Sequence, residues 1–124
     1  MTIETSRADI ATFQERAAAG SVHFDPAAAR RCAEMYQHEA DRLVHLRRRL
    51  ESLADLQGFG GFGSARELQA GFGAKARDAA ELLDNYIEAA YAMQAAFLTS
   101  AGLYEEADAA NAAAMRALEA SVRA

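Results

Sequence analysis

The chain has 124 residues and a mass of 13.3 kDa, which is the size of a single domain. Alanine occupies 32 positions, proline only one, and β-branched residues are few, so the composition predicts an all-α fold with a thin core. The net charge of -5 and the scattered basic residues exclude a phosphate-binding surface, and no nucleic acid partner is expected.

The sequence also argues against a membrane-inserted protein. No stretch approaches the roughly 18 consecutive apolar residues of a spanning helix, so no integral membrane segment is expected. The first nine residues lack the basic and then apolar layout of a Sec signal peptide. Any export of this chain is therefore expected to use a route other than Sec.

The first half of the chain predicts a short helix followed by a long one. Residues 6–19 carry apolar side chains at helical intervals, at Ile10, Phe13 and Ala17. Gly20 is suited to end that helix. Asp25 and Pro26 are a strong helix start, because aspartate accepts hydrogen bonds from free backbone N–H groups and proline has a preset φ. A long helix is therefore predicted over 26–56.

Glycine interrupts the helical pattern at residues 57–63. Four glycines within six positions destabilise a helix and permit positive φ. This turn motif comprises Gly58, Phe59, Gly60, Gly61, Phe62 and Gly63. Ser64 and Glu67 then have the spacing of a capping box, which predicts that a second long helix spans 64–101. Because the connection is short, the two long helices are predicted to form an antiparallel hairpin.

Large apolar residues recur along one face of each long helix, and we call this set the hairpin stripe. It comprises Tyr36, Leu43, Leu46, Leu50, Leu53, Leu68, Phe72, Leu82, Tyr86, Met93 and Phe97. A second group widens the apolar surface beyond what one partner helix covers: Met35, Val44, Leu83, Ile87, Tyr91 and Leu98. We therefore expect a second hairpin to pair with the first as a four-helix bundle, in a homodimer or a heterodimer. The alternative is that the N-terminal helix covers this face within the same chain.

The last segment, residues 102–124, is alanine-rich and predicts a helical tail with few large apolar side chains. Tyr104 and Asp108 are four positions apart, so they share one face of such a helix. Met115 follows seven positions after Asp108. A ring and a carboxylate on one face can be recognised together by a receptor. The same spacing also arises by chance in an acidic helix, where it would be ordinary solvated surface.

This order of features resembles the WXG-type, ESAT-like proteins of type VII secretion. The shared features are a helix, a glycine-aromatic-glycine turn, a second helix and a Tyr-x-x-x-acid motif, and they cover about residues 25–115. Where that family carries a Trp-x-Gly turn, this chain has two Gly-Phe-Gly triplets within residues 57–63. The resemblance implies that Tyr104, Asp108 and Met115 form an export signal.

The resemblance also implies a non-enzymatic function. Proteins of that family pair as helical hairpins, as homodimers or with a sister protein, and a secretion ATPase recognises the signal tail. The chain would then be a secretion substrate, a secretion partner or both. It would be cytoplasmic before export and afterwards secreted or located in the cell envelope. The alternative is an intracellular dimeric α-helical scaffold or regulatory module unrelated to secretion.

Residues with catalytic or metal-binding chemistry are few. Glu34, His38 and His45 fall roughly on one helix face and offer three zinc ligands, but the second long helix supplies no histidine. Cys32 has no evident base beside it, and no phosphate-binding glycine motif follows a strand. Arg47 belongs to a run of three arginines that is expected to lie on a solvated helix face. No catalytic residue, metal or cofactor is therefore predicted.

Overall fold

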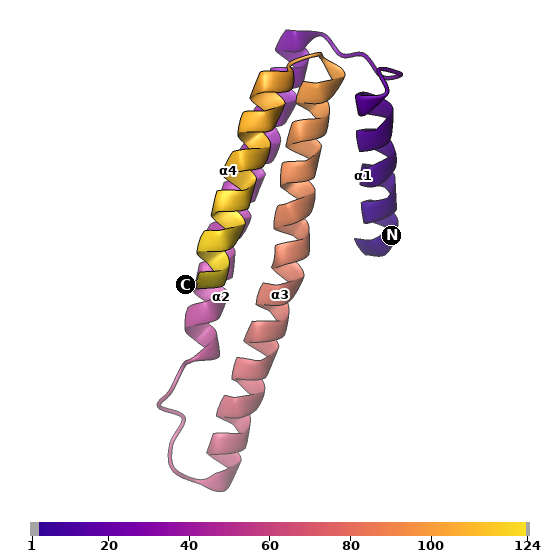
Figure 1. Ribbon diagram of the computed structural model, residues 1–124. Coiled ribbons are helices and arrows are strands. Elements are labelled where there is room, and N and C mark those ends of the chain that lie inside the picture. Colours follow the sequence, from indigo (N-terminus) through magenta and orange to yellow (C-terminus); the bar gives the residue numbers. More distant parts are fainter. Residues whose placement is uncertain (1–2, 124) are drawn as a thin grey trace.

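The computed structural model describes residues 3–123, and every regular element within them is a helix (Figure 1). The long helices α2, Pro26–Ala54, and α3, Gly63–Ser100, run antiparallel and pack against each other. The shorter helices α1, Ile3–Ala18, and α4, Tyr104–Arg123, lie beside the part of the hairpin that is farthest from its turn. The predicted all-α fold with a long antiparallel hairpin is therefore confirmed.

The end of α1 and the start of α2 follow the local sequence. Asp25 is the N-cap of α2, and its Oδ2 accepts a hydrogen bond from the N–H of Ala28 at 3.1 Å. Pro26 occupies the first helical position, where its missing N–H costs nothing. After α1, Gly20 has a φ of 74° and donates its N–H to the carbonyl of Ala17 at 3.2 Å. Asp25 and Pro26 therefore start α2, and Gly20 follows the end of α1, as the sequence predicts.

The start of α3 differs from the predicted capping box. The helix begins at Gly63, its N-cap is Phe62, and no side chain caps it. Ser64 therefore has helical geometry, whereas an N-cap residue needs an extended backbone to accept from the N–H groups ahead of it. The prediction was wrong because Gly63 lets the helix extend one residue further toward the turn. The first hydrogen bond of α3 runs from the N–H of Arg66 to the carbonyl of Phe62 at 3.0 Å.

An aromatic cluster holds α1 against the hairpin. The ring of Phe13 on α1 meets Phe97 of α3 edge-on, with 5.1 Å between ring centroids. Phe13 also lies 6.2 Å from Phe24 in the loop before α2, and Phe97 stacks on Tyr36 of α2 at 5.8 Å. Such pairs contribute beyond the area that they bury. The N-terminal helix therefore covers part of the hairpin within the same chain, as the alternative above held.

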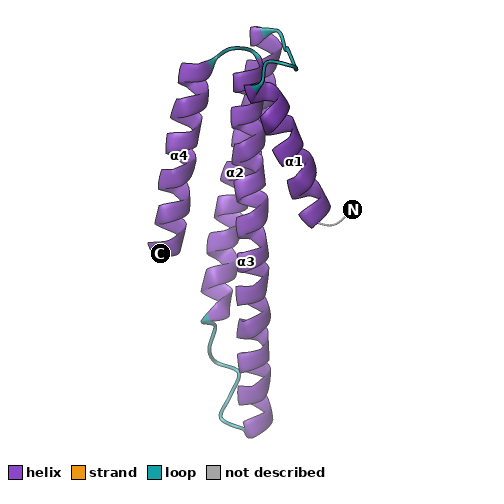
Figure 2. Cartoon of the chain, turned by 45° about the vertical axis from the view of Figure 1, so that its right-hand side comes forward, coloured by secondary structure: helices purple, strands orange, loops and turns teal. Residues whose placement is uncertain are grey.

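An alanine face holds α4 on the opposite side of the hairpin (Figure 2). Ala107, Ala110 and Ala114 follow one another at helical spacing, and all three are buried. They join two clusters of buried residues that draw on α2, α3 and α4 together. Because alanine has a short side chain, α4 can approach α3 closely and remove the adjoining face of the hairpin from solvent.

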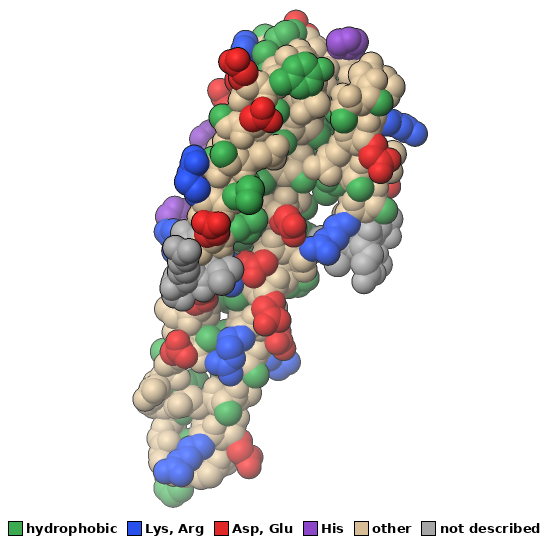
Figure 3. Space-filling model, in the orientation of Figure 1, with side chains coloured by type: hydrophobic (Ala, Val, Ile, Leu, Met, Phe, Trp, Pro, Cys, Tyr) green, Lys and Arg blue, Asp and Glu red, His purple; other side chains and the backbone are tan. Residues whose placement is uncertain are grey.

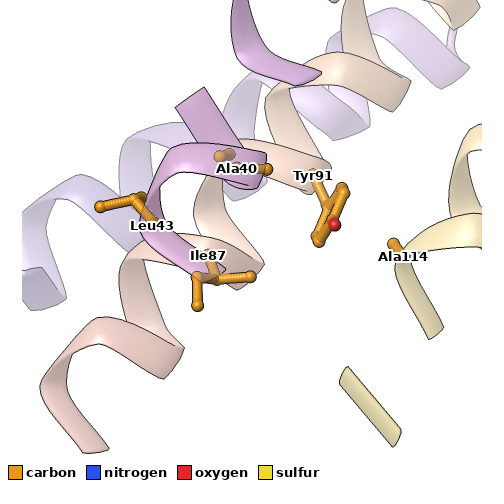
Figure 4. Close-up of a cluster of buried hydrophobic side chains, with 6 residues drawn as sticks. Ala40, Leu43, Ile87, Tyr91 and Ala114 are labelled. Atoms are coloured by element: carbon orange, nitrogen blue, oxygen red, sulfur yellow. The ribbon is translucent and has the colours of Figure 1, made fainter. Parts of the chain in front are cut away.

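Ile87, Tyr91 and Leu98 correct one expectation. They were expected to need a second molecule as cover, yet they are 1%, 6% and 5% exposed. Ile87 and Tyr91 pack in one cluster with Ala114 of α4 (Figure 4), and Leu98 packs with Ala107 and Ala110. The expectation was wrong because residues 102–124 have few large apolar side chains, so their alanines were not expected to pack against the hairpin. Met35, from the same group, is exposed.

Arg47 corrects a second expectation. It was expected on a solvated face but is only 9% exposed, while Arg48 and Arg49 beside it are exposed. Its Nε donates to Asp84 Oδ1 of α3 at 2.5 Å, and its guanidinium also pairs with Glu51 one turn further along α2. These partners raise the pKa of Arg47, and the hydrogen bond to Asp84 is the largest cause. No sequence pattern predicts this contact, because Asp84 is 37 positions away.

Candidate functional site

The residues of the predicted export signal lie on one exposed face of α4. Tyr104 is 60% exposed, Met115 is 65% exposed, and Asp108 is also exposed. Intervals of four and seven residues place the three along one side of the helix, away from the buried alanine face. The three side chains therefore occur together on a packed helix and not on an irregular tail.

The connection between α3 and α4 sets where this face begins. Gly102 has a φ of 76°, and the N–H of Leu103 donates to the carbonyl of Leu98 at 2.9 Å. Leu103 also packs against the buried cluster that contains Leu98. Tyr104 is the next residue and the first of α4, so its position is determined by the end of the hairpin.

An ion pair joins the first turn of α4 to α2. Arg30 Nη2 donates to Glu106 Oε1 at 2.8 Å, and Arg30 Nε donates to the same carboxylate at 3.1 Å. The hydrogen bond lowers the pKa of Glu106 and raises the pKa of Arg30. Both side chains remain about half exposed, so the pair orients α4 more than it stabilises the fold. The partners are 76 positions apart, and no sequence pattern predicts their contact.

The structure divides the hairpin stripe into a covered part and an uncovered part. Leu43 is buried, and four further members are half-buried: Tyr36, Leu50, Met93 and Phe97. The remaining six are exposed: Leu46, Leu53, Leu68, Phe72, Leu82 and Tyr86. These six side chains do not pack between α2 and α3, as residues that hold a hairpin together would. Small buried residues occupy that interface instead, among them Ala40, Ala76 and Ala80.

The two phenylalanines of the turn motif have different environments. Phe59 is half-buried, and its ring lies 6.1 Å from that of Phe72 on α3. It therefore packs against α3 near the turn. Phe62 is 82% exposed at the tip of the molecule. Among the glycines, Gly58 and Gly60 have φ values of 94° and 113°, which explains why glycine is needed at these two positions.

An apolar hollow of about 370 Å³ lies between α1 and the end of the hairpin stripe that is farthest from the turn. We call it the α1 hollow. Its α1 wall contains Ser6, Asp9 and Ile10, and its hairpin wall contains Tyr36, Leu43, Tyr86, Ala89 and Met93. It is open at the surface. Sequence reasoning did not anticipate the hollow, because it depends on how closely α1 approaches the two long helices.

The residues weighed as zinc ligands do not form a site. Glu34, His38 and His45 are all exposed on α2. In the part of the chain that the structure describes, no three His, Cys, Asp or Glu residues are grouped so that they could hold a metal ion. Cys32 is a half-buried free thiol. The zinc alternative therefore has no geometric support.

Within residues 3–123, no helix combines the length and the apolar character needed to cross a membrane. No family model, no curated protein and no solved structure matches this chain. The exposed face of α4 and the uncovered part of the hairpin stripe are therefore the surfaces from which a function is inferred. The face that Figure 3 shows carries mixed charges around α4, with acidic and basic side chains interspersed.

Proposed function

We propose that this chain is a non-enzymatic substrate or partner of a type VII, ESX-like secretion system. In this proposal it dimerises through its helical hairpin, with itself or with a sister hairpin protein. The exposed face of α4 binds the secretion ATPase through Tyr104 and Asp108. The protein is cytoplasmic before export and reaches the cell envelope or the medium by a route other than Sec.

The observation that carries the proposal is the exposed face formed by Tyr104, Asp108 and Met115. A receptor that binds these side chains meets them on a helix that is already folded and packed. Little conformational entropy is then lost when the complex forms, which favours affinity. The alanine face of α4 is buried against the hairpin, and the three signal residues belong to the surface of α4 that stays exposed to a partner.

The uncovered part of the hairpin stripe supports the pairing. Its leucine and aromatic side chains are between 37% and 63% exposed. Burial by a partner would therefore contribute roughly half of the 1.5 to 3 kcal/mol that such a side chain contributes when it starts fully exposed. A single exposed leucine needs no explanation, but several on one face of two adjacent helices are typical of an interaction surface.

The test is the amount of protein in the culture supernatant of the source organism, with a cytosolic enzyme as the lysis control. The double variant Tyr104→Ala/Asp108→Ala should fall at least about tenfold in the supernatant, as expected when a small anchor cluster is lost. Glu105→Ala is the matched control, because it removes an exposed carboxylate from the same turn but outside the motif. It should be exported as the wild type is.

Helicity and melting temperature of each variant must equal those of the wild type, so that lost export is not lost folding. Equal export of the double variant and the wild type would contradict the assigned signal. If the wild type itself stays inside the cell, the secretion proposal fails and the intracellular scaffold or regulatory module takes its place.

A further inference from the structure

The α1 hollow lies between two points at which α1 is attached to the hairpin. Phe13 holds one end of α1 through the aromatic cluster. Nearer the start of the helix, Arg7 pairs with Glu88 of α3 at 3.4 Å. Asp9 and Ile10, which line the hollow, lie between these two attachments. Because α1 is held on both sides of it, the hollow is formed before any ligand arrives, as most small-molecule sites are.

The hollow exists because α1 packs against α3 and approaches α2 less closely. Side chains of α2, namely Tyr36, Glu39 and Leu43, therefore form its far wall. On α3, Ala89 and Ala90 have short side chains that leave the space between the walls unfilled. The resulting volume of about 370 Å³ lies within the range of pockets that bind small molecules, roughly 300 to 1,000 Å³.

The charged side chains that line the hollow are acidic. Asp9 of α1 and Glu39 of α2 stand on facing walls, and the described lining residues include no Lys, Arg or His. Glu39 accepts a hydrogen bond from Nε of Arg42 at 3.1 Å, which lowers the pKa of Glu39 and keeps it ionised at neutral pH. Arg42 itself does not line the hollow. The lining therefore favours a cation over a neutral molecule or an anion.

Two tyrosine rings add to this preference. Tyr36 and Tyr86 both line the hollow, and the ring of Tyr36 is stacked on Phe97 at 5.8 Å, which restricts its orientation. The face of a tyrosine ring attracts a cation that lies within roughly 6 Å of the ring centre. Ile10 and Met93 provide apolar surface beside the rings. The hollow thus offers contacts to a positive group and to an apolar body at the same time.

An organic cation suits this lining better than a metal ion does. A metal ion needs several oxygen or nitrogen ligands in exchange for its water. In the described part of the chain, no three His, Cys, Asp or Glu residues are grouped so that they could hold one. Most of the lining is carbon, which is suited to an alkyl or aryl group. The net charge of -5 also attracts cations to the protein as a whole.

We propose that the α1 hollow binds a small organic cation, an alkylammonium or arylammonium compound free in solution. Its ammonium group lies between Asp9 and Glu39, and its apolar body packs against Ile10, Leu43 and Met93. The site goes beyond the proposed function, because it uses neither the signal face of α4 nor the uncovered part of the hairpin stripe. A ligand bound there contacts α1 and both long helices, so it also stabilises the attachment of α1.

Three probes with the same phenyl group test the preference for positive charge: 2-phenylethylammonium, 2-phenylethanol and 3-phenylpropanoate. Each is titrated into the full-length protein while the NMR signals of the Ile10 and Met93 methyl groups are recorded. The ammonium probe should bind with a Kd on the order of 1 mM or below, as expected for so small a ligand. The alcohol should bind at least about fivefold more weakly, and the anion more weakly still.

Variants of the two acids test where the ammonium group lies. Asp9→Asn should weaken binding of the ammonium probe by about fivefold and leave binding of the alcohol within about twofold. Glu39→Gln should have a smaller effect, about twofold to threefold, because Arg42 already offsets part of the charge of Glu39. Glu15→Gln is the matched control, since Glu15 is exposed on α1 outside the hollow. It should bind all three probes as the wild type does.

A second pair of variants tests the apolar part of the site. Ala89→Leu fills the hollow and should abolish binding of the ammonium probe and of the alcohol. Ala92→Leu is the control, because Ala92 is also half-buried on α3 but lies outside the hollow. Hydrogen exchange of the α1 amides shows whether α1 stays attached in each variant. If Ala89→Leu displaces α1, Asp9→Asn decides the outcome, because it leaves the apolar lining unchanged.

Three outcomes would overturn the inference. No binding of the ammonium probe at about 10 mM would show that the hollow holds no such cation. Equal affinity for the alcohol and the ammonium probe would show an apolar site without preference for charge. Binding of the ammonium probe that Asp9→Asn leaves unchanged would place the cation elsewhere on the acidic surface. Export of the wild type and of Tyr104→Ala/Asp108→Ala is measured separately, so neither proposal depends on the other.

Discussion

The two halves of the hairpin are built from different residues. The half far from the turn is covered by α1 and α4, and its interior is mostly small, with several alanines around Ile87 and Tyr91. The half near the turn carries larger side chains, including Leu68 and Phe72, yet these are exposed. Large side chains therefore occur in both halves, but most of those near the turn are exposed because the chain provides no third helix there.

Whether a side chain on the hairpin is buried thus depends on whether α1 or α4 covers it, and not on how apolar the side chain is. Alanine is buried in the covered half because its small side chain lets α4 approach α3 closely. Leucine is exposed in the half near the turn because only two helices are present there, and two helices cannot enclose a stripe on their common face. The covered half resembles a small protein core, and the half near the turn resembles one side of an interface.

The largest expected effect comes from Ile87→Ala in the covered half. Ile87 is 1% exposed, so truncation leaves a cavity and should lower the free energy of unfolding by about 2 to 4 kcal/mol. Leu82→Ala, five residues away on the same helix but 47% exposed, should cost less than about 1 kcal/mol in the monomer. Urea unfolding at low protein concentration checks both. Equal losses would show that the two halves do not differ.

A second pair of variants compares two glycines of α3 in the half near the turn. A Cβ at Gly73 would lie 2.6 Å from the carbonyl oxygen of Ala54, a backbone atom that cannot move away cheaply. Gly73→Ala should therefore destabilise the fold by about 1 to 3 kcal/mol. At Gly71 a Cβ meets nothing within 4 Å, so Gly71→Ala should stabilise the helix by about 0.5 to 1 kcal/mol.

Thermal unfolding of both variants measures this difference. Stabilisation by Gly73→Ala would mean that α2 and α3 separate near Ala54. Such a result would show that the half near the turn is looser than a two-helix contact between Gly73 and Ala54 implies.

A third variant removes the attachment of α1. The ring of Phe13 packs against the rings of Phe97 and Phe24. Phe13→Ala should therefore lower the protection of α1 amides against hydrogen exchange by about 1 to 2 kcal/mol. The protection of α3 should change little. Thr12→Ala, at the exposed neighbouring position, is the control and should leave α1 protected. Uniform loss across all helices would instead show that α1 folds only together with the hairpin.

Much of this fold was predictable, because local signals in the sequence determine helix boundaries. Asp25 and Pro26 start α2, Gly20 follows α1, and the glycines of the turn separate α2 from α3. The helices begin and end within about one turn of the predicted positions, the usual precision for such boundaries. The one local error, Ser64 as N-cap, arose because glycine permits the helix to start early.

The predictions that were wrong concern side chains whose burial or pairing depends on contacts between distant segments. The helical spacing of Tyr104, Asp108 and Met115 was visible, but nothing in the sequence said which face of that helix would be buried. Alanine at helical intervals is compatible with a packed face or with a solvated one. The ion pair of Arg47 with Asp84 was missed for the same reason, since a run of arginines is usually solvated and its partner lies on another helix.

The smallest expected effect concerns α4 and the pH dependence of its attachment. The pKa of Glu106 is lowered from its ordinary value of 4.5, chiefly by the hydrogen bond from Arg30. A lowered pKa in the folded state means that the carboxylate favours the attached helix at pH above its ordinary value. That contribution is lost as the pH falls through the lowered pKa. Amide exchange of α4 should therefore gain speed, after correction for intrinsic rates, as the pH falls below that ordinary value.

Glu106→Gln isolates this effect, because glutamine keeps the shape of the side chain and removes its charge. The variant should show a slightly less protected α4 at pH 7 and a flatter pH profile, while α3 behaves as in the wild type. Glu105→Gln is the control, since Glu105 is exposed on the same turn, and it should retain the wild-type profile. An unchanged profile in Glu106→Gln would mean that the alanine face alone holds α4. The exposed signal face would then keep its orientation in acidic surroundings as well as at neutral pH.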